Sequence, residues 1–415
     1  MKILVIGINY YPEITSTGLY TTQMCEWLVE KGHTVSVITG FPYYPKWKIY
    51  DRYDNKLYDI ESVNGVNIYR SYVYVPDTVT SIKRIIHELS FEFSSMFNLL
   101  RQIRMSPDVV ISISPPFLIG LHGYFVSVLL NIPFVYHIQD LQIDAAADLQ
   151  MIKNNKVLNT LRYVERLILK KADLITTISM GMKEKIINKG IDEKKVTLFP
   201  NWADIRDVKP LEKNNEFRIV NEIDKDDFVV LYAGNIGEKQ GLDYVVDAAS
   251  LLINKNMIKF LIVGEGAKKE WLINRVKKLN LHNVQFLGIQ PKEILPNMLS
   301  AADICLVPQQ KDVTDIVMPS KLTNILASGT PALVSANESC EVSKVVQKYQ
   351  CGIVIEPENP EVMAETIVNL YNNREKLSEL GINGRKYAEE YLDIDKILGS
   401  FESKLKELKD GGKNG

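Results

Sequence analysis

The sequence predicts an α/β protein with two Rossmann-like, doubly wound domains, each with a parallel sheet covered by helices. Short apolar segments rich in β-formers alternate with helical patterns along the whole chain. With 415 residues, 46% of them hydrophobic, the chain is too long for one core and sufficient for two. The polar segment Ala203 to Asp227 separates two series of strands. The expected domains are 1–205 and 206–385, followed by a helical segment, 386–415, that we expect to pack back on the first domain.

The expected strands are apolar segments bounded by polar or glycine-containing turns. In the first domain they cover residues 2–8, 34–39, 66–71, 109–113, 134–138, 174–178 and 196–199. In the second domain they cover residues 228–233, 259–263, 284–287, 304–307, 331–335 and 352–355. Because ligands of such folds bind at the carboxyl ends of parallel strands, we expect a ligand site at those ends, between the domains.

The segment Phe117 to Tyr136 is long enough to span a bilayer, but it contains His122 and the break Asn131-Ile-Pro133. We therefore expect a buried helix followed by a strand. The apolar start of the chain, Met1 to Gly7, is too short for a secretory signal and predicts a first strand. These features favour a cytoplasmic protein.

Overall charge and cysteine content exclude several classes of protein. There are 49 basic and 51 acidic side chains, and the net charge of −2 gives no broad field for binding nucleic acid. The four cysteines form no CxxC pair, which indicates a reducing compartment and neither a disulfide framework nor a zinc site. Two Asp-x-Asp sequences, at Asp224 and Asp393, lie in polar or terminal surroundings, and we expect no metal role for them.

The segment Val317 to Val334 has the layout of a phosphate and ribose site. Pro319 fits a helix start and Ser320 could cap the helix, so free amides of the first turn would lie beside the charge of Lys321. Asn324 on that turn could hold a sugar hydroxyl. The alternative is an ordinary crossover between a helix and a strand.

The glycine-rich turns of the chain differ from the dinucleotide-binding fingerprint. No GxGxxG follows the first strand, and Gly264-Glu-Gly266 lacks the third glycine, which argues against a nicotinamide enzyme. The turn Thr17-Gly18 could bring backbone amides to a diphosphate, or it could be a plain turn. In the turn Tyr232 to Leu242, glycines permit close backbone approach and Lys239 could neutralise charge on a departing phosphate.

Seven motifs in chain order are similar to those of the family 4 retaining glycosyltransferases with the GT-B fold. They are Tyr11-Pro-Glu13 with Thr17-Gly18, Gly32 to Val35, Phe199 to Asp204, Tyr232 to Leu242, Val263 to Gly266, Phe286-Leu-Gly288 and Ala327 to Pro331. Pro42 to Pro45 and His137 to Asp140 resemble the branch of colanic-acid, fucosyl and N-acetylfucosaminyl transferases of bacterial surface-polysaccharide assembly.

The resemblance implies a UDP- or GDP-linked sugar donor in the second domain, an acceptor in the first, and no cofactor. His137 matches the histidine near the donor sugar, although a satisfied histidine at a strand end is the alternative. Either Lys239 or Gln240 occupies the place of a phosphate-binding lysine in the family. Lys239, His137 and Lys321 are the three catalytic candidates. The expected donor-binding residues are Thr17, Gly18, Gly234, Asn235, Gly237, Gln240, Gly264, Gly266, Leu287, Gly288, Asp315, Met318, Pro319, Ser320 and Asn324. The expected acceptor-binding residues are Tyr11, Glu13, Tyr44, Trp47 and Asp140.

The chain departs from the family pattern at the two glutamates that lie eight residues apart. Ile316 and Asn324 occupy these places, and Asn235 replaces the usual arginine. Backbone amides near Met318 could take over part of the sugar contact. The resemblance implies metal-independent loss of the nucleotide diphosphate, with attack of the acceptor hydroxyl on the same face and charge offset by lysines and helix starts.

Two features suggest a lipid-linked acceptor, such as a polyprenyl-diphosphate glycan. A helical apolar stripe with interspersed basic residues runs from Ser81 to Arg104, and an aromatic and basic loop runs from Phe41 to Arg52. Both suit an anionic membrane surface, here the cytoplasmic face of the inner membrane. Core packing of the helix and an ordinary structured loop are the equally weighted alternative. A nucleotide-sugar epimerase of the same fold and a non-catalytic sugar-binding protein are the alternative functions.

Overall fold

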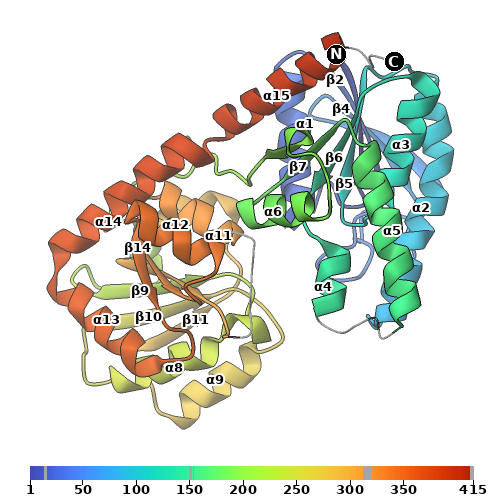
Figure 1. Ribbon diagram of the computed structural model, residues 1–415. Helices are drawn as coiled ribbons and strands as arrows, with labels where there is room; N and C mark the ends of the chain where they lie inside the picture. Colours follow the sequence, from blue (N-terminus) through green and yellow to red (C-terminus); the bar gives the residue numbers. More distant parts are fainter. Residues whose placement is uncertain (14–15, 149–151, 153, 312–318, 412–415) are drawn as a thin grey trace. The chain divides into compact units, whose positions relative to one another are not determined.

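The computed structural model describes residues 1–13, 16–148, 152, 154–311 and 319–411, and it confirms the α/β class with two parallel-sheet units. The first unit comprises Met1–Pro200 together with the chain from Leu398, and the second comprises Asn201–Ile397. Each unit is a sheet with helices on both of its faces (Figure 1). The boundary between the units thus falls after Pro200. The chain rejoins the first unit at Leu398, within the last helix, whereas the segment expected to pack on the first domain began at residue 386.

The first unit contains an eight-stranded sheet with the order β3-β4-β2-β1-β5-β6-β7-β8. The central strands are buried on both faces, which is why they read as continuous apolar runs in the sequence. Every neighbouring pair is parallel except β3 with β4. The strands are β1 (Lys2–Ile6), β2 (Thr34–Gly40), β3 (Tyr58–Val63), β4 (Val66–Ser71), β5 (Val109–Ser114), β6 (Phe134–Ile138), β7 (Leu174–Thr177) and β8 (Val196–Leu198).

The edge strand β3 was not predicted. It is antiparallel to β4 and mostly exposed, so it shows no apolar run. The turn between the two strands is Asn64-Gly65, and both residues have positive φ, 49° and 79°. Asn-Gly with this backbone is typical of a two-residue hairpin turn, so the dipeptide was the available sequence signal.

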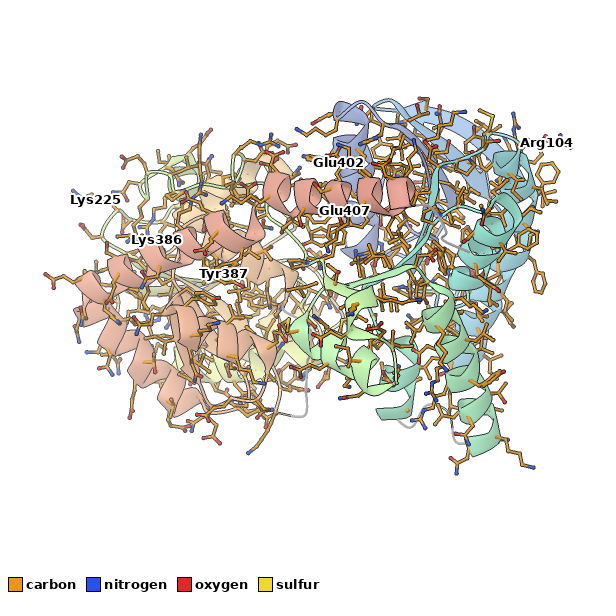
Figure 2. The ribbon with its side chains drawn as sticks, turned by 45° about the horizontal axis from the view of Figure 1, so that its top comes forward. Arg104, Lys225, Lys386, Tyr387, Glu402 and Glu407 are labelled. Carbon is orange, nitrogen blue, oxygen red and sulfur yellow. The ribbon has the colours of Figure 1, made fainter. Side chains whose placement is uncertain are left out.

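The helices of the first unit connect its parallel strands and cover both faces of the sheet (Figure 1). They are α1 (Ser16–Glu30), α2 (Ser81–Ile103), α3 (Ile119–Leu130), α4 (Gln142–Asp148), α5 (Asn155–Lys171) and α6 (Met180–Asn188). The final helix, α15 (Ile394–Gly411), begins in the second unit and continues in the first. On α15, Glu402 (labelled in Figure 2) lies 2.8 Å from Nε2 of His33, and Phe401 stacks on Phe199.

The second unit contains a six-stranded, fully parallel sheet with the order β11-β10-β9-β12-β13-β14. Its strands are β9 (Phe228–Ala233), β10 (Ile258–Val263), β11 (Val284–Leu287), β12 (Ile304–Pro308), β13 (Ala332–Ser335) and β14 (Gly352–Ile355). Its helices are α7 (Glu216–Val220), α8 (Leu242–Leu251), α9 (Lys269–Lys278), α10 (Leu295–Ser300), α11 (Ser320–Ala327), α12 (Glu341–Tyr349), α13 (Pro360–Asn372) and α14 (Arg374–Tyr387). All six strands lie within two residues of their predicted bounds.

The segment Phe117 to Tyr136 divides as predicted, into α3 and the start of β6. Asn131 ends the helix in the left-handed conformation. The expectation that this helix is buried was only half right, because Phe125 and Val128 on its outer side are exposed. Among the helices that the structure describes, none is both long and apolar enough to cross a bilayer.

Candidate active site

The loops after β9, β10 and β11 meet at the carboxyl edge of the second sheet. The amide of Gly234 donates to the carbonyl of Val263 at 3.0 Å, and the amide of Gly264 donates to the carbonyl of Leu287 at 3.1 Å. The amide of Ile236 donates to the carbonyl of Glu265 at 2.8 Å. The expected donor-binding segments around residues 234, 264 and 287 are therefore neighbours in this unit.

Two glycines in these loops are required by close backbone packing. A Cβ atom at Gly264 would lie 1.9 Å from the carbonyl oxygen of Gly234. A Cβ atom at Gly266 would lie 2.2 Å from the carbonyl oxygen of Ile236. The contact between the two loops therefore explains both glycines without a ligand.

Lys321 joins this edge from the first turn of α11. Its Nζ lies 4.4 Å from the ring centroid of Tyr232, the penultimate residue of β9. Its Cδ is 4.0 Å from the position that a Cβ atom of Gly234 would take. Burial lowers the pKa of Lys321 to about 7.

The start of α11 differs from the expected cap. Pro319 occupies the cap position with an extended ψ of 129°, and no side chain caps the helix. Ser320 is instead the first helical residue and exposed, so the prediction that its hydroxyl caps the helix was wrong. Asn324 is half-buried on the same helix. The expected donor residues Asp315 and Met318, and Ile316 between them, lie outside the described residues.

Lys239 lies in a short 3₁₀ turn, Glu238–Gln240, after β9, and its side chain is exposed. Its carbonyl accepts a hydrogen bond of 3.1 Å from the amide of Gln310, which fixes the turn. Asn235 and Gln240 approach each other over Gly237, where an added Cβ atom would lie 3.0 Å from Nδ2 of the first and from Oε1 of the second. The turn therefore presents the exposed charge of Lys239 and two amide side chains, while its Glu238 pairs with Lys268 at 2.8 Å.

Three residues of this edge were missed as site residues. The hydroxyl of Tyr232 donates to the carbonyl of Asn235 at 2.5 Å, which holds the turn above Lys321. Lys269 donates to Glu265 at 2.6 Å and to the carbonyls of Gly264 at 3.0 Å and Leu287 at 3.4 Å. Glu265 lies before the start of α9, so the helical i,i+4 spacing rule did not apply to this pair and gave no signal. Nothing in the sequence marked Tyr232 as more than a strand residue.

In the first unit, His137 lies on β6 with 3% of its surface exposed. Its Nδ1 is 2.9 Å from Oγ1 of Thr176, and its ring meets Phe199 edge to face at 5.1 Å. Burial lowers the pKa of His137 to about 3. The ring is therefore neutral at physiological pH and can exchange hydrogen bonds but cannot supply a positive charge.

The other polar candidates of the first unit differ in accessibility. Asp140 is exposed on the loop after β6, two residues beyond the strand. Thr17 and Gly18 lie in the first turn of α1, where Thr17 is buried. A Cβ atom at Gly18 would lie 3.1 Å from Cβ of Glu13, so packing against that residue also favours glycine here.

Glu13 is a buried carboxyl group with 2% exposure. Its Oε1 accepts the amides of Tyr43 and Tyr44, both at 2.9 Å, and its Oε2 accepts Nδ2 of Asn9 at 2.8 Å. Burial raises the pKa of Glu13 to about 7, against these hydrogen bonds, which lower it. Its oxygens are already used inside the protein, so the expected direct contact with an acceptor does not fit. Glu13 instead positions the loop that carries Tyr44.

The aromatic loop after β2 is structured. The ring of Trp47 packs against Tyr43 at 5.4 Å and against His87 at 5.1 Å. The hydroxyl of Tyr50 donates to the carbonyl of Tyr44 at 2.7 Å. Tyr44 and Trp47 are half-buried, as is Tyr11 on the neighbouring loop. The structure therefore favours the interpretation of an ordinary structured loop over one that inserts freely into lipid.

The second unit thus places half-buried Lys321, at the start of α11, beside the loop after β9, which also carries exposed Lys239. Within the described ranges, no three His, Cys, Asp or Glu side chains gather as a metal site would require. Asp393, one of the Asp-x-Asp residues, accepts the amide of Asp395.

Comparison with known proteins agrees with this architecture. Residues 213–387 match the family model described as "Glycosyl transferases group 1", and residues 16–202 match "Glycosyl transferase 4-like domain". The chain is 37% identical over 407 residues to the putative colanic acid biosynthesis glycosyl transferase WcaI of Escherichia coli strain K12, covering 97% of this chain and 98% of that protein.

Solved structures show the same fold at low sequence identity. Sucrose-phosphate synthase of Thermosynechococcus elongatus matches with a TM-score of 0.75 at 18% identity, over 99% of this chain and 100% of that chain. The Anabaena protein HepE, solved in complex with UDP, matches with a TM-score of 0.70 at 14% identity, over 98% of this chain and 100% of that chain.

The two parallel-sheet units and these matches define a glycosyltransferase with the GT-B fold. The chain belongs to family 4 of these enzymes, and within it the chain is similar to the transferases of surface-polysaccharide assembly.

Proposed function

We propose that this enzyme transfers a hexose or deoxyhexose, with fucose and N-acetylfucosamine as candidates, from a UDP- or GDP-linked donor to a lipid-linked glycan. The acceptor would be a polyprenyl-diphosphate glycan in the assembly of O-antigen, capsule or exopolysaccharide. The similarity to the colanic acid transferase supports the class of product. The UDP complex of HepE supports a nucleotide-linked donor.

The main support for the proposed donor site is the position of Lys321 beside the loop after β9. A lysine whose pKa burial has lowered to about 7 gains its full charge when an anion enters beside it. The start of α11 adds its amides, whose dipoles favour the same negative charge. These groups suit a diphosphate bound across residues 234 and 321.

We propose that transfer retains the anomeric configuration and requires no metal. The bond between the anomeric carbon and the diphosphate oxygen would break, and the acceptor hydroxyl would attack from the same face. Lys321 and Lys239 would then offset the charge that develops on the departing nucleotide diphosphate. Neutral His137 would exchange a hydrogen bond with the sugar or the acceptor, and Asn324 would contact the ribose.

We propose that the acceptor binds to the first unit, near Tyr11, Tyr44, Trp47 and Asp140. Glu13 fixes the amides of the loop that carries Tyr44, so it would set the shape of this site without touching the acceptor. The proposed acceptor brings the enzyme to the cytoplasmic face of the inner membrane as a peripheral protein.

A panel of ligands tests the donor. The melting temperature is measured with UDP, GDP and their sugars, since a ligand that binds only the native state raises it. We expect one nucleotide to raise the melting temperature in the wild type and to do so less in Lys321→Met. The proposal fails if neither nucleotide does so. Incubation of the donor alone, followed by analysis of the sugar, tests the alternative of an epimerase, which would change the sugar without an acceptor.

A further inference from the structure

Helix α2 turns its polar side toward the protein and its apolar side outward. The buried residues include five polar or charged ones, His87, Glu92, Ser95, Asn98 and Gln102. The exposed residues include Phe93 and Ile82, at 79% and 72% exposure. The further exposed apolar residues of this helix are Ile85, Ile86, Met96, Phe97 and Leu100. The stripe predicted from the sequence exists, but it does not pack into a core, so that alternative was wrong.

Specific hydrogen bonds fix this orientation. Nδ1 of His87 lies 2.6 Å from the carbonyl of Tyr74. Nδ2 of Asn98 donates to the carbonyl of Arg70 at 3.0 Å and to Oγ of Ser71 at 2.9 Å. Rotating the helix to bury its apolar side would break these bonds and leave buried polar groups unpaired. The outward apolar stripe is therefore built into the fold.

The neighbouring helix α3 continues the apolar surface. It packs against α2 on one side and α5 on the other, and the three helices lie in a row (Figure 1). Every exposed residue of α3 is apolar: Leu121, Phe125, Val128 and Leu129. On the β3 side, the ring of Phe97 packs on exposed Tyr58 at 5.2 Å.

Exposed charge on these helices has one sign. Glu92 pairs with His122 at 2.6 Å, Glu165 pairs with Lys189 at 2.6 Å, and half-buried Glu88 lies between Arg84 and Gln142. Among the residues of α2, α3 and α5 that the structure describes, no acidic side chain is exposed. The exposed cations beyond Arg84 are Arg101 and Arg104 at the end of α2 and Lys156, Arg162, Arg166, Lys170 and Lys171 on α5.

Two of these cations, Arg104 and Lys171, lie at the borders of the apolar surface. Figure 2 shows Arg104 at the end of α2. On the other border, Nζ of Lys171 lies 5.6 Å from the ring centroid of Tyr124 on α3. We name the exposed apolar residues of α2 and α3, with these cations of α2 and α5, the cationic apolar face. It combines uncharged side chains in the middle with positive charge at its edges.

We propose that the cationic apolar face is the surface by which the first unit enters the interface of an anionic lipid bilayer. This inference deepens the proposed function and rests on its lipid-linked acceptor. The stripe from Ile82 to Leu100 runs about 27 Å along α2 at 1.5 Å per residue, so the helix would lie parallel to the bilayer surface. Its apolar side chains would reach the acyl boundary while the cations meet lipid phosphates.

Charge favours a bilayer over a second copy of the chain. A two-fold contact through this face would bring the same cations of both copies together, with no exposed carboxylate on the three helices to offset them. An anionic lipid surface supplies the missing negative charge. The aromatic loop is less suited to insertion, because Trp47 already packs on Tyr43 and His87.

Vesicle flotation tests this inference. The full chain is mixed at low salt with vesicles of phosphatidylcholine alone or with phosphatidylglycerol. We expect the wild type to float with the anionic vesicles and to remain in solution with neutral ones. The double variant Phe93→Ser with Phe97→Ser should lower the vesicle-bound fraction by about tenfold or more, since it removes two inserting rings. The matched control is Ile219→Ser, which changes a residue of the second unit that is 76% exposed.

A second variant tests the charge. Replacing Arg101, Arg104 and Lys171 by glutamine should weaken flotation and its dependence on salt while leaving the apolar side chains in place. The inference is overturned if the wild type does not float, or if the double serine variant floats as well as the wild type. It is also overturned if light scattering shows a wild-type dimer that the serine variant abolishes, because the face would then bind a second copy.

The outcomes are separable from those of the proposed function. Nucleotide-dependent stabilisation is measured on the same samples without lipid, and the serine variant should keep it. A wild-type protein that binds nucleotide but does not float contradicts the membrane surface alone. Flotation without any nucleotide binding contradicts the proposed donor and leaves the membrane surface supported.

Discussion

Lys321 makes donor binding depend on pH in a direction that can be calculated. Burial lowers the pKa of Lys321 to about 7, so about half of the molecules carry the charge at neutral pH and about one in a hundred near pH 9. A bound diphosphate stabilises the charged form. If Lys321 stays protonated in the complex, the apparent affinity should fall about 50-fold between pH 7 and pH 9, equivalent to about 2.3 kcal/mol.

Isothermal titration with UDP and GDP measures this effect. We expect proton uptake approaching one per bound nucleotide near pH 8 to 9, detected with buffers of different ionisation enthalpy. Lys321→Met should bind more weakly near pH 7 and lose the slope, because methionine fills the space without titrating. The same slope in Lys321→Met, or none in the wild type, would refute the reasoning.

The free energy of unfolding should also depend on pH through Lys321. Between a pKa of about 7 in the folded state and the ordinary value of 10.5 in the unfolded state, only the unfolded chain holds this proton. The contribution of Lys321 to the free energy of unfolding therefore rises with pH across that window, and Lys321→Met should remove it. Urea titrations of both proteins at three pH values measure the difference.

Variants at three further residues separate the parts of the site. Lys239→Ala should reduce the rate of transfer by about 10- to 100-fold and nucleotide affinity by much less. The reason is that Lys239 is proposed to offset charge that develops only as the nucleotide diphosphate departs. Equal losses of rate and affinity would contradict this role. Gly264→Ala should lower the free energy of unfolding by about 1 to 3 kcal/mol, through the clash with the carbonyl of Gly234, and unchanged denaturation would argue against the observed loop contact. Glu13→Ala should leave two loop amides unpaired and impair acceptor use, whereas Glu13→Gln, which keeps an accepting oxygen, should restore much of it; donor binding should be unaffected in both.

The parallel strands could be predicted from the sequence because burial on both faces leaves an uninterrupted apolar run. β5 is such a strand, with every residue buried. The edge strand β3 could not be found by that rule, since its residues face solvent and partner only β4. Its hairpin turn, Asn64-Gly65, was a local signal that does not depend on burial.

The direction in which α2 faces could not be read from its periodicity. An apolar stripe specifies that one side of a helix differs from the other, and burial of that side is the usual outcome. Here, buried partners for His87 and Asn98 determine the orientation, and those partners lie on other elements. The grouping of Lys321 with the loop after β9 was predictable for a different reason, because parallel strands end at a common edge.

The passage of α15 from the second unit into the first has a consequence for synthesis. Phe199 and His33, made in the first half of the chain, obtain their partners Phe401 and Glu402 from near its end. A fragment that stops at Pro200 lacks both contacts and is a poor choice for expressing the first unit alone. During translation, the first unit would complete its contacts only after α15 has been made, so the second unit can complete its own core first.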